Sequence, residues 1–141
     1  MDEPALRRLL GGVVDGSVTA DEAVTRLRRL PFGEVAAGRV DHHRALRTGL
    51  PEAVYSPGKT PEQCVQLVGE LLAEEGGPVL LTRADTDQVD AVLAAHPDGI
   101  VSGAGPHLVV WRPAAPGRRR AAVVSAGTAD GPVAEEAAIT L

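Results

Sequence analysis

The sequence predicts an α/β chain made of a helical hairpin, a small α/β domain, and the first strand and helix of a further parallel-sheet domain. Three observations predict this. Helical periodicity fills residues 1–30, short β-type runs alternate with helical runs over residues 32–112, and a stretch rich in proline, glycine and arginine precedes a final strand–turn–helix pattern. Strands that alternate with helices are typical of α/β and α+β proteins.

Residues 1–30 predict two helices joined by a turn. The apolar residues at helical spacing in the first helix are Leu6, Leu9, Leu10, Val13 and Val14. Residues 15–17 form the turn that ends it. In the second helix, Thr19 and Glu22 have the spacing of a capping box, and Pro31 ends the helix.

Alternating elements are expected over residues 32–112. Strands are predicted at 34–41, 52–55, 79–82, 100–102 and 108–111, and helices at 60–75 and 86–95. Thr60 and Gln63 form a second capping box, with Pro61 at the first helical position. The run 79–82 is continuously apolar up to its last residue, which favours a buried strand.

A domain boundary is predicted where Pro113 begins a stretch that ends in Arg118, Arg119 and Arg120. We therefore expect a first domain at residues 1–115, a linker at 116–120 and the start of a second domain at 121–141. Residues 121–125 predict a buried strand, and a helix begins near Pro132. One strand and one helix cannot form a parallel sheet, so we expect the second domain to be incomplete and the chain to be a fragment.

Composition argues against several classes of protein. Phe32, Tyr55 and Trp111 are the only aromatic residues, and the formal net charge is −5, so a nucleic-acid partner is not expected. The single cysteine, Cys64, excludes an internal disulfide. No basic-then-apolar leader and no apolar run of roughly 18 residues is present, which predicts a cytoplasmic protein without a membrane partner.

The turn that follows the last predicted strand has the composition of an anion-binding loop. Gly127 permits a tight turn, Ser125 and Thr128 supply hydroxyl groups, and Asp130 or a neighbour caps the following helix. The free N–H groups and dipole of that helix favour a phosphate or carboxylate. The alternative is an ordinary loop whose polar residues only cap the helix, and residue chemistry alone supports both interpretations equally.

Two other residue types invite a functional interpretation. Cys64 has apolar residues three, four, seven and eight positions further along its predicted helix, which favours a buried structural cysteine over a reactive thiol. His42 and His43 directly follow the strand predicted at 34–41, and neighbours in a strand point to opposite faces, so a shared metal ion is not expected without a bend. Orienting a substrate or holding the loop by hydrogen bonds fits these histidines better.

Four ordered segments resemble one family. Residues 123–137 (VVSAGTADGPVAEEA) closely resemble the opening of the carboxylase domain of LarB proteins. Upstream, the segments 40–52 (VDHHRALRTGLPE), 58–63 (GKTPEQ) and 80–83 (LLTR) resemble the family's N-terminal portion. Small departures are Gly131, where the family usually has leucine, and residues 56–57, where a glycine-containing turn is more usual.

LarB proteins act in the biosynthesis of the nickel-pincer cofactor. The resemblance implies carboxylation of the pyridinium ring of nicotinic acid adenine dinucleotide, followed by hydrolysis of its phosphoanhydride and release of AMP. It implies a fold similar to aminoimidazole ribonucleotide carboxylase, carbon dioxide or bicarbonate as co-substrate, no tightly bound cofactor, and Mg²⁺ as the candidate ion for hydrolysis. It also implies a homo-oligomer for the full-length family.

The resemblance assigns ligand contacts but no catalytic residue. The family's nucleophilic cysteine and supporting glutamate lie far downstream of the 125–130 turn, so Cys64 does not take that role. The residues predicted to bind phosphate or carboxylate are Ser125, Gly127, Thr128 and Asp130. The secondary candidates, for the pyrophosphate or the AMP portion, are Arg44, Arg47 and Lys59. The alternative for these three cations is surface ion pairing with Asp41 or Glu52.

A competing interpretation gives the chain no catalytic role. It would be an accessory domain that binds nucleotide or forms an assembly surface, with the strand 121–125 left exposed. A mononucleotide carboxylase of purine synthesis is a weaker alternative, because it does not account for the segments at 40–83.

Overall fold

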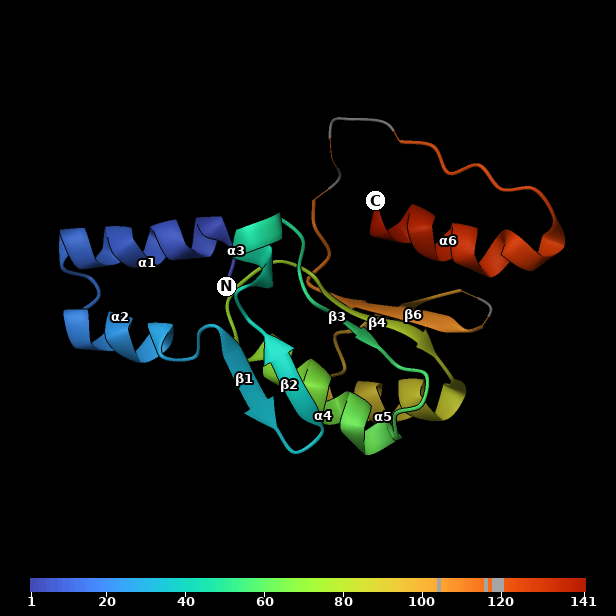
Figure 1. Cartoon of the computed structure of the whole chain (residues 1–141), viewed down its shortest axis with the longest axis horizontal. Coiled ribbons are helices and arrows are strands. Elements are labelled where there is room, and N and C mark those ends of the chain that lie inside the picture. The colour runs from blue at the N-terminus through green and yellow to red at the C-terminus, as the bar shows by residue number, and fades with distance from the viewer. Residues whose placement is uncertain (104, 116, 118–120) are drawn as a thin grey trace.

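A computed structural model of the chain describes residues 1–103, 105–115, 117 and 121–141, and shows a projecting helical hairpin, a sheet with helices on it, and a C-terminal helix (Figure 1). The elements are α1 (Glu3–Asp15), α2 (Ala20–Leu27), β1 (Phe32–Val35), β2 (Gly38–Asp41), α3 (Arg44–Thr48), β3 (Ala53–Tyr55), α4 (Pro61–Leu72), β4 (Val79–Ala84), α5 (Thr86–Ala95), β5 (Ile100–Ser102), β6 (His107–Trp111), the 3₁₀ turn η1 (Thr128–Asp130) and α6 (Gly131–Thr140). Mixed helices and strands confirm the predicted α/β class.

The helical hairpin forms as the sequence predicts. Asp2 caps α1 by accepting a hydrogen bond from the Ala5 amide at 2.8 Å, and Gly16 ends the helix with φ +80°. Thr19 and Glu22 make the expected capping box at the start of α2. The glycine that ends α1 and the capping box that starts α2 therefore fix the two ends of the connection between the helices.

The single strand expected at residues 34–41 is instead a two-stranded hairpin. β1 and β2 pair antiparallel, with Phe32 opposite Asp41 and Val35 opposite Gly38. Gly38, with φ +148°, supplies the backbone conformation that lets the chain reverse there. The polar stretch after β2, for which no element was predicted, forms the short helix α3.

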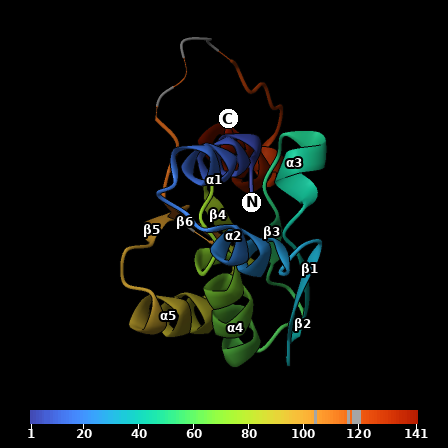
Figure 2. The ribbon, with the colours of Figure 1, turned by 90° about the vertical axis from the view of Figure 1, so that its left-hand side faces the viewer.

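The main sheet has the strand order β3-β4-β6-β5. Strands β3 and β4 are parallel and connected through α4, whereas β6 pairs antiparallel with both β4 and β5. Figures 1 and 2 show α4 and α5 against one face of this sheet and α6 on the opposite side. The carboxyl ends of β3 and β4 consequently lie at the same edge of the sheet.

The core lies between the sheet and helices α4 and α5. Its fully buried members include Cys64, Val68, Leu81, Val92 and Val109. Trp111 is 2% exposed and donates a hydrogen bond from its indole N–H to the His96 carbonyl oxygen at 2.9 Å. The buried cysteine confirms the structural interpretation of Cys64.

The predicted buried strand at residues 121–125 is wrong. Residues 121–126 have no regular secondary structure and are exposed, with Val124 91% exposed. A β-strand needs a neighbour to satisfy its backbone N–H and C=O groups, and no strand of the described residues pairs with this segment. Helix α6 forms where predicted. Of the helices in the described ranges, none has the length and apolar character to cross a membrane.

Candidate functional site

The turn predicted to bind an anion forms at the start of α6. Gly127 has φ +101°, a conformation that favours glycine, and residues 128–130 make one 3₁₀ turn that leads directly into the helix. Ser125, Gly127, Thr128 and Asp130 are all exposed. The side chain of Asp130 makes no capping hydrogen bond to the described residues, so the first backbone N–H groups of α6 are not capped by it. This geometry can present amide donors to an anion.

The signature segment at 40–52 is organised by Asp41. Its carboxylate accepts hydrogen bonds from the His43 amide at 3.0 Å and from the Arg47 guanidinium at 2.8 and 3.3 Å. The hydrogen bonds from Arg47 lower the pKa of the Asp41 carboxyl below its ordinary value. Arg47 therefore makes the ion pair with Asp41 that was the alternative to ligand contact.

His42 joins three parts of the fold. Its side chain is 1% exposed, and Nε2 lies 2.8 Å from Oε1 of Glu70 on α4. Glu70 also accepts a hydrogen bond from Arg29 at 2.6 Å, and the N-terminal ammonium donates to the His42 carbonyl oxygen at 2.8 Å. His42 thus holds the loop and the helical hairpin against α4. Within the described part of the chain, no group of three or more histidine, cysteine or acidic residues could hold a metal ion.

Acid is expected to weaken this network. Burial alone would raise the pKa of Glu70, but the hydrogen bonds from His42 and Arg29 outweigh it and the pKa falls below 4.5. The folded state then binds a proton at Glu70 less readily than the unfolded state does. The contribution of Glu70 to the stability of the fold is therefore fully present above about pH 4.5, and it is lost as the pH falls through the folded pKa. Urea unfolding between neutral pH and pH 3 should show that the free energy of unfolding falls more steeply with pH in the wild type than in Glu70→Gln. Equal slopes would contradict this role of Glu70.

Arg44 lies in a different environment from Arg47. It lines a cavity of about 760 Å³ between the sheet and α6, whose other walls include Leu80, Val110 and Ile139. The described lining is mostly aliphatic, and Arg44 is the one cationic side chain among the described lining residues. A cavity of this size is within the range of small-molecule sites, about 300–1,000 Å³.

Lys59 lies in a tightly held loop after β3. Its ammonium donates a hydrogen bond to the Tyr55 carbonyl oxygen at 2.6 Å. Ser56 is buried and donates from its hydroxyl to the Thr82 carbonyl oxygen at 2.6 Å. The buried amide of Gln88 donates to the carbonyl oxygens of Ser56 and Lys59 at 3.1 and 2.7 Å. These bonds tie the loop to both β4 and α5.

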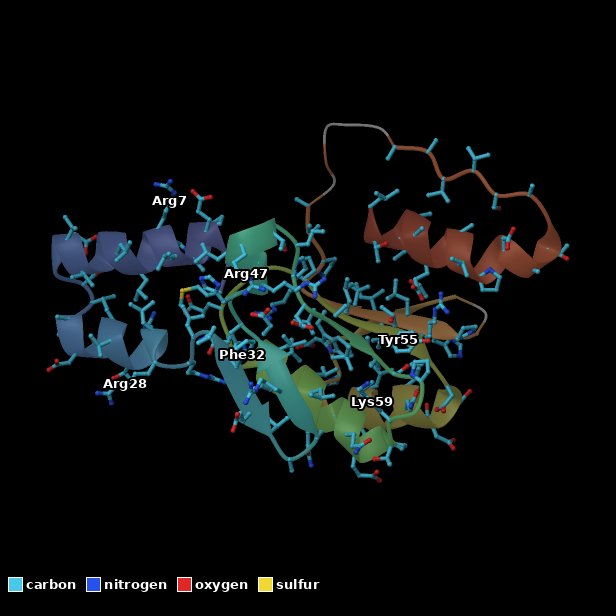
Figure 3. All side chains as sticks on the ribbon, in the orientation of Figure 1. Arg7, Arg28, Phe32, Arg47, Tyr55 and Lys59 are labelled. Carbon is cyan, nitrogen blue, oxygen red and sulfur yellow. The ribbon has the colours of Figure 1, made fainter. Side chains whose placement is uncertain are left out.

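The three secondary cations do not converge. Arg44 lines the cavity, Arg47 pairs with Asp41, and Lys59 follows β3. Figure 3 shows Arg47 and Lys59 well apart, with Tyr55 on the same side of the molecule as Lys59. Because the three side chains lie in three different environments, a single ligand group cannot contact all of them in this structure.

Tyr55 and Arg83 were not singled out from the sequence. The Arg83 guanidinium lies over the Tyr55 ring, 5.9 Å from its centroid, and its Nε is 3.9 Å from Oε2 of Glu136 on α6. Arg83 has φ +55°, which is uncommon for a residue with a side chain. The only sequence signals were that Tyr55 is one of three aromatic residues and that Arg83 ends the segment 80–83.

Cys64 is not a reactive thiol in this structure. It is fully buried on α4, and burial raises the pKa of its thiol above the ordinary value of 9.0. The thiol therefore stays protonated at neutral pH, which disfavours nucleophilic attack.

The fold is that of an α/β protein whose sheet domain is followed by an exposed turn and the helix α6. Residues 32–112 match the family model described as the LarB/PurE-like N-terminal domain. That match covers more than half of the chain, and the chain belongs to this carboxylase-like family. It confirms the resemblance drawn from residues 40–83.

An uncharacterized protein of Methanocaldococcus jannaschii is also similar. It is 27% identical over 144 residues, which cover 96% of this chain and 56% of that protein. The chain thus spans about half the length of the curated relative it matches.

Proposed function

We propose that the chain takes part in the carboxylation of the pyridinium ring of nicotinic acid adenine dinucleotide and in hydrolysis of its phosphoanhydride. The observation that carries the proposal is the family match over residues 32–112, which the resemblance of residues 123–137 to the start of the LarB carboxylase domain supports. Carbon dioxide or bicarbonate would be the co-substrate. A homo-oligomeric assembly and help from Mg²⁺ in hydrolysis belong to the same proposal.

The role proposed for this chain is to bind and orient the dinucleotide. The exposed turn at 127–130 would place backbone N–H groups and the Thr128 hydroxyl against a phosphate. The Asp130 carboxylate would repel a phosphate, so it suits a ligand hydroxyl as a hydrogen-bond acceptor. Arg44, in the cavity beneath α6, and Lys59 remain secondary contacts in this proposal, whereas Arg47 would first have to leave Asp41.

Covalent catalysis by a thiol is not assigned to these residues. Cys64 is the only cysteine among residues 1–141, and it is buried with a raised pKa. A nucleophile that attacks the pyridinium ring must reach the ligand as a thiolate. Within residues 1–141, the proposed contribution is therefore binding rather than bond formation.

Replacing Thr128 and Asp130 together with alanine is expected to weaken binding of nicotinic acid adenine dinucleotide by about tenfold or more, because two polar contacts are lost. Isothermal titration calorimetry on the purified protein measures the change. Thr25→Ala is a matched control, since that exposed hydroxyl on α2 donates to the Asp21 carbonyl oxygen at 2.8 Å and belongs to neither the turn nor the cavity. It should leave the affinity unchanged.

Equal affinities for the wild type and the double variant would overturn the role of the turn. The non-catalytic interpretation would then take its place. The exposure of residues 121–126, with Val124 projecting into solvent, is the observation that favours an assembly surface in that case.

A further inference from the structure

We propose that Tyr55, Lys59 and Arg83 form a binding site for a nucleoside monophosphate at the edge of the sheet where β3 and β4 end. The ligand class combines a phosphate, for the two cations, with a flat base, for the aromatic ring. Lys59 is also a secondary dinucleotide contact in the proposed function, but the inference is argued from this edge alone and stands whether or not the dinucleotide is the substrate of the protein.

The position of the three residues is the first argument. Tyr55 is the last residue of β3, and Arg83 is the next-to-last residue of β4. The two strands are parallel, with Tyr55 opposite Thr82, so their carboxyl ends open onto the same edge. Open α/β sheets bind their ligands outside the carboxyl ends of such strands.

The rigidity of the Lys59 loop is the second argument. The Lys59 amide donates to the Ser56 carbonyl oxygen at 3.0 Å, and Gly58 between them has φ +81°. The buried Gln88 side chain holds both ends of this turn through the carbonyl oxygens of Ser56 and Lys59. A side-chain carbon added at Gly58 would meet no atom within 4 Å, so the turn faces open space. A fixed loop with free space above it is preorganised for a ligand.

The backbone of Arg83 is the third argument. Its left-handed conformation coincides with a shift in the pairing of β4 with β6 between Leu81 and Ala84. Bulges and left-handed residues redirect side chains and are concentrated at functional sites. Here the Arg83 side chain departs from the regular alternation of the strand, and its guanidinium lies over the Tyr55 ring.

The three side chains retain hydrogen-bond donors and ring surface that a ligand can use. Lys59 has used one of its three ammonium N–H groups on the Tyr55 carbonyl oxygen, and the others can donate to a phosphate. Glu136 approaches Arg83 only at 3.9 Å, too far for a strong hydrogen bond, so a phosphate can replace it. Tyr55 is 53% exposed, which leaves ring surface for a base to stack on.

A second arginine–aromatic pair provides the matched control. Arg39 lies over Phe32 at 5.1 Å from the ring centroid, on the β1–β2 hairpin. Arg39 is already paired with Glu34 at 2.7 Å, and Figure 3 shows its neighbour Phe32 apart from Tyr55 and Lys59. Arg39→Gln therefore changes an exposed arginine next to an aromatic ring without touching the proposed site.

The test is titration of the purified protein with AMP, followed by backbone amide NMR shifts. Lys59→Gln and Arg83→Gly should each weaken AMP binding by about tenfold, because a charge-assisted hydrogen bond is lost. Tyr55→Ala should weaken it by about fivefold or more through lost stacking. Glu136→Gln should tighten it by about two- to threefold, because a competing carboxylate is removed. Arg39→Gln should have no effect.

Arg83→Gly also separates binding from folding. Glycine adopts φ +55° without steric cost, so this variant should unfold no more easily than the wild type while it loses affinity. Failure of the wild type to bind millimolar AMP, or unchanged affinity in the Lys59 and Arg83 variants, would overturn the site. Inorganic phosphate binding as tightly as AMP would overturn the nucleotide assignment. The dinucleotide affinity of the Thr128 and Asp130 variant is measured separately and tests only the proposed function.

Discussion

Replacing Gly33 with alanine is expected to destabilise the protein by about 2–4 kcal/mol, from overpacking together with a lost buried hydrogen bond. Gly33 is buried in β1, and an added methyl group would collide with Glu70 Oε1 and His42 Nε2. The collision separates the two groups that join the signature segment to α4. Urea unfolding followed by circular dichroism measures the free energy of unfolding.

A control and a background variant test this explanation. Gly11→Ala lies in α1, where the new methyl group meets nothing within 4 Å, and it should stabilise the protein by about 0.5–1 kcal/mol through helix propensity. In a Glu70→Ala background, Gly33→Ala should cost clearly less than in the wild type, because one colliding group is gone. Equal costs in both backgrounds would show that the collision with Glu70 is not the cause.

Much of the fold could be predicted because its signals are local. The capping boxes at Thr19 and Thr60 fix helix starts from residues three positions apart, and both form as predicted. The strand at 121–125 fails for the opposite reason. Its apolar residues favour β structure, but pairing depends on a neighbouring strand that the local sequence does not specify. The β1–β2 hairpin was missed because its reversal at Gly38 interrupts what looked like one continuous strand.

The candidate sites also differ in whether local sequence signals predict them. The glycine-dependent turn at 127–130 could be anticipated, since the need for a left-handed residue is visible in the sequence. The left-handed conformation of Arg83 could not, because an arginine gives no sign of it. Nor could the sequence show that Arg44 and Arg47, three positions apart on α3, serve a cavity and an ion pair respectively.

Trp111→Ala is expected to cost about 3–5 kcal/mol of stability, the second large effect, because it empties a buried site in the core. The side chain is 2% exposed and fits against Gly99. Trp111→Phe should cost about 1–3 kcal/mol, because the His96 carbonyl oxygen loses its hydrogen bond and part of the volume is lost. Thermal unfolding of the three proteins at neutral pH should rank them wild type, phenylalanine, alanine.

Tyr55→Ala provides the matched comparison for Trp111→Ala. Both substitutions remove an aromatic ring at the end of a strand of the same sheet, but Tyr55 is 53% exposed and its ring contact is with Arg83. The loss of stability should therefore stay below about 1 kcal/mol. A larger loss would mean that Tyr55 supports the sheet, and that weaker AMP binding in this variant reflects a damaged edge. A small loss combined with weaker binding assigns the ring to the ligand, since the sheet that contains Arg83 and precedes the Lys59 loop is then unchanged.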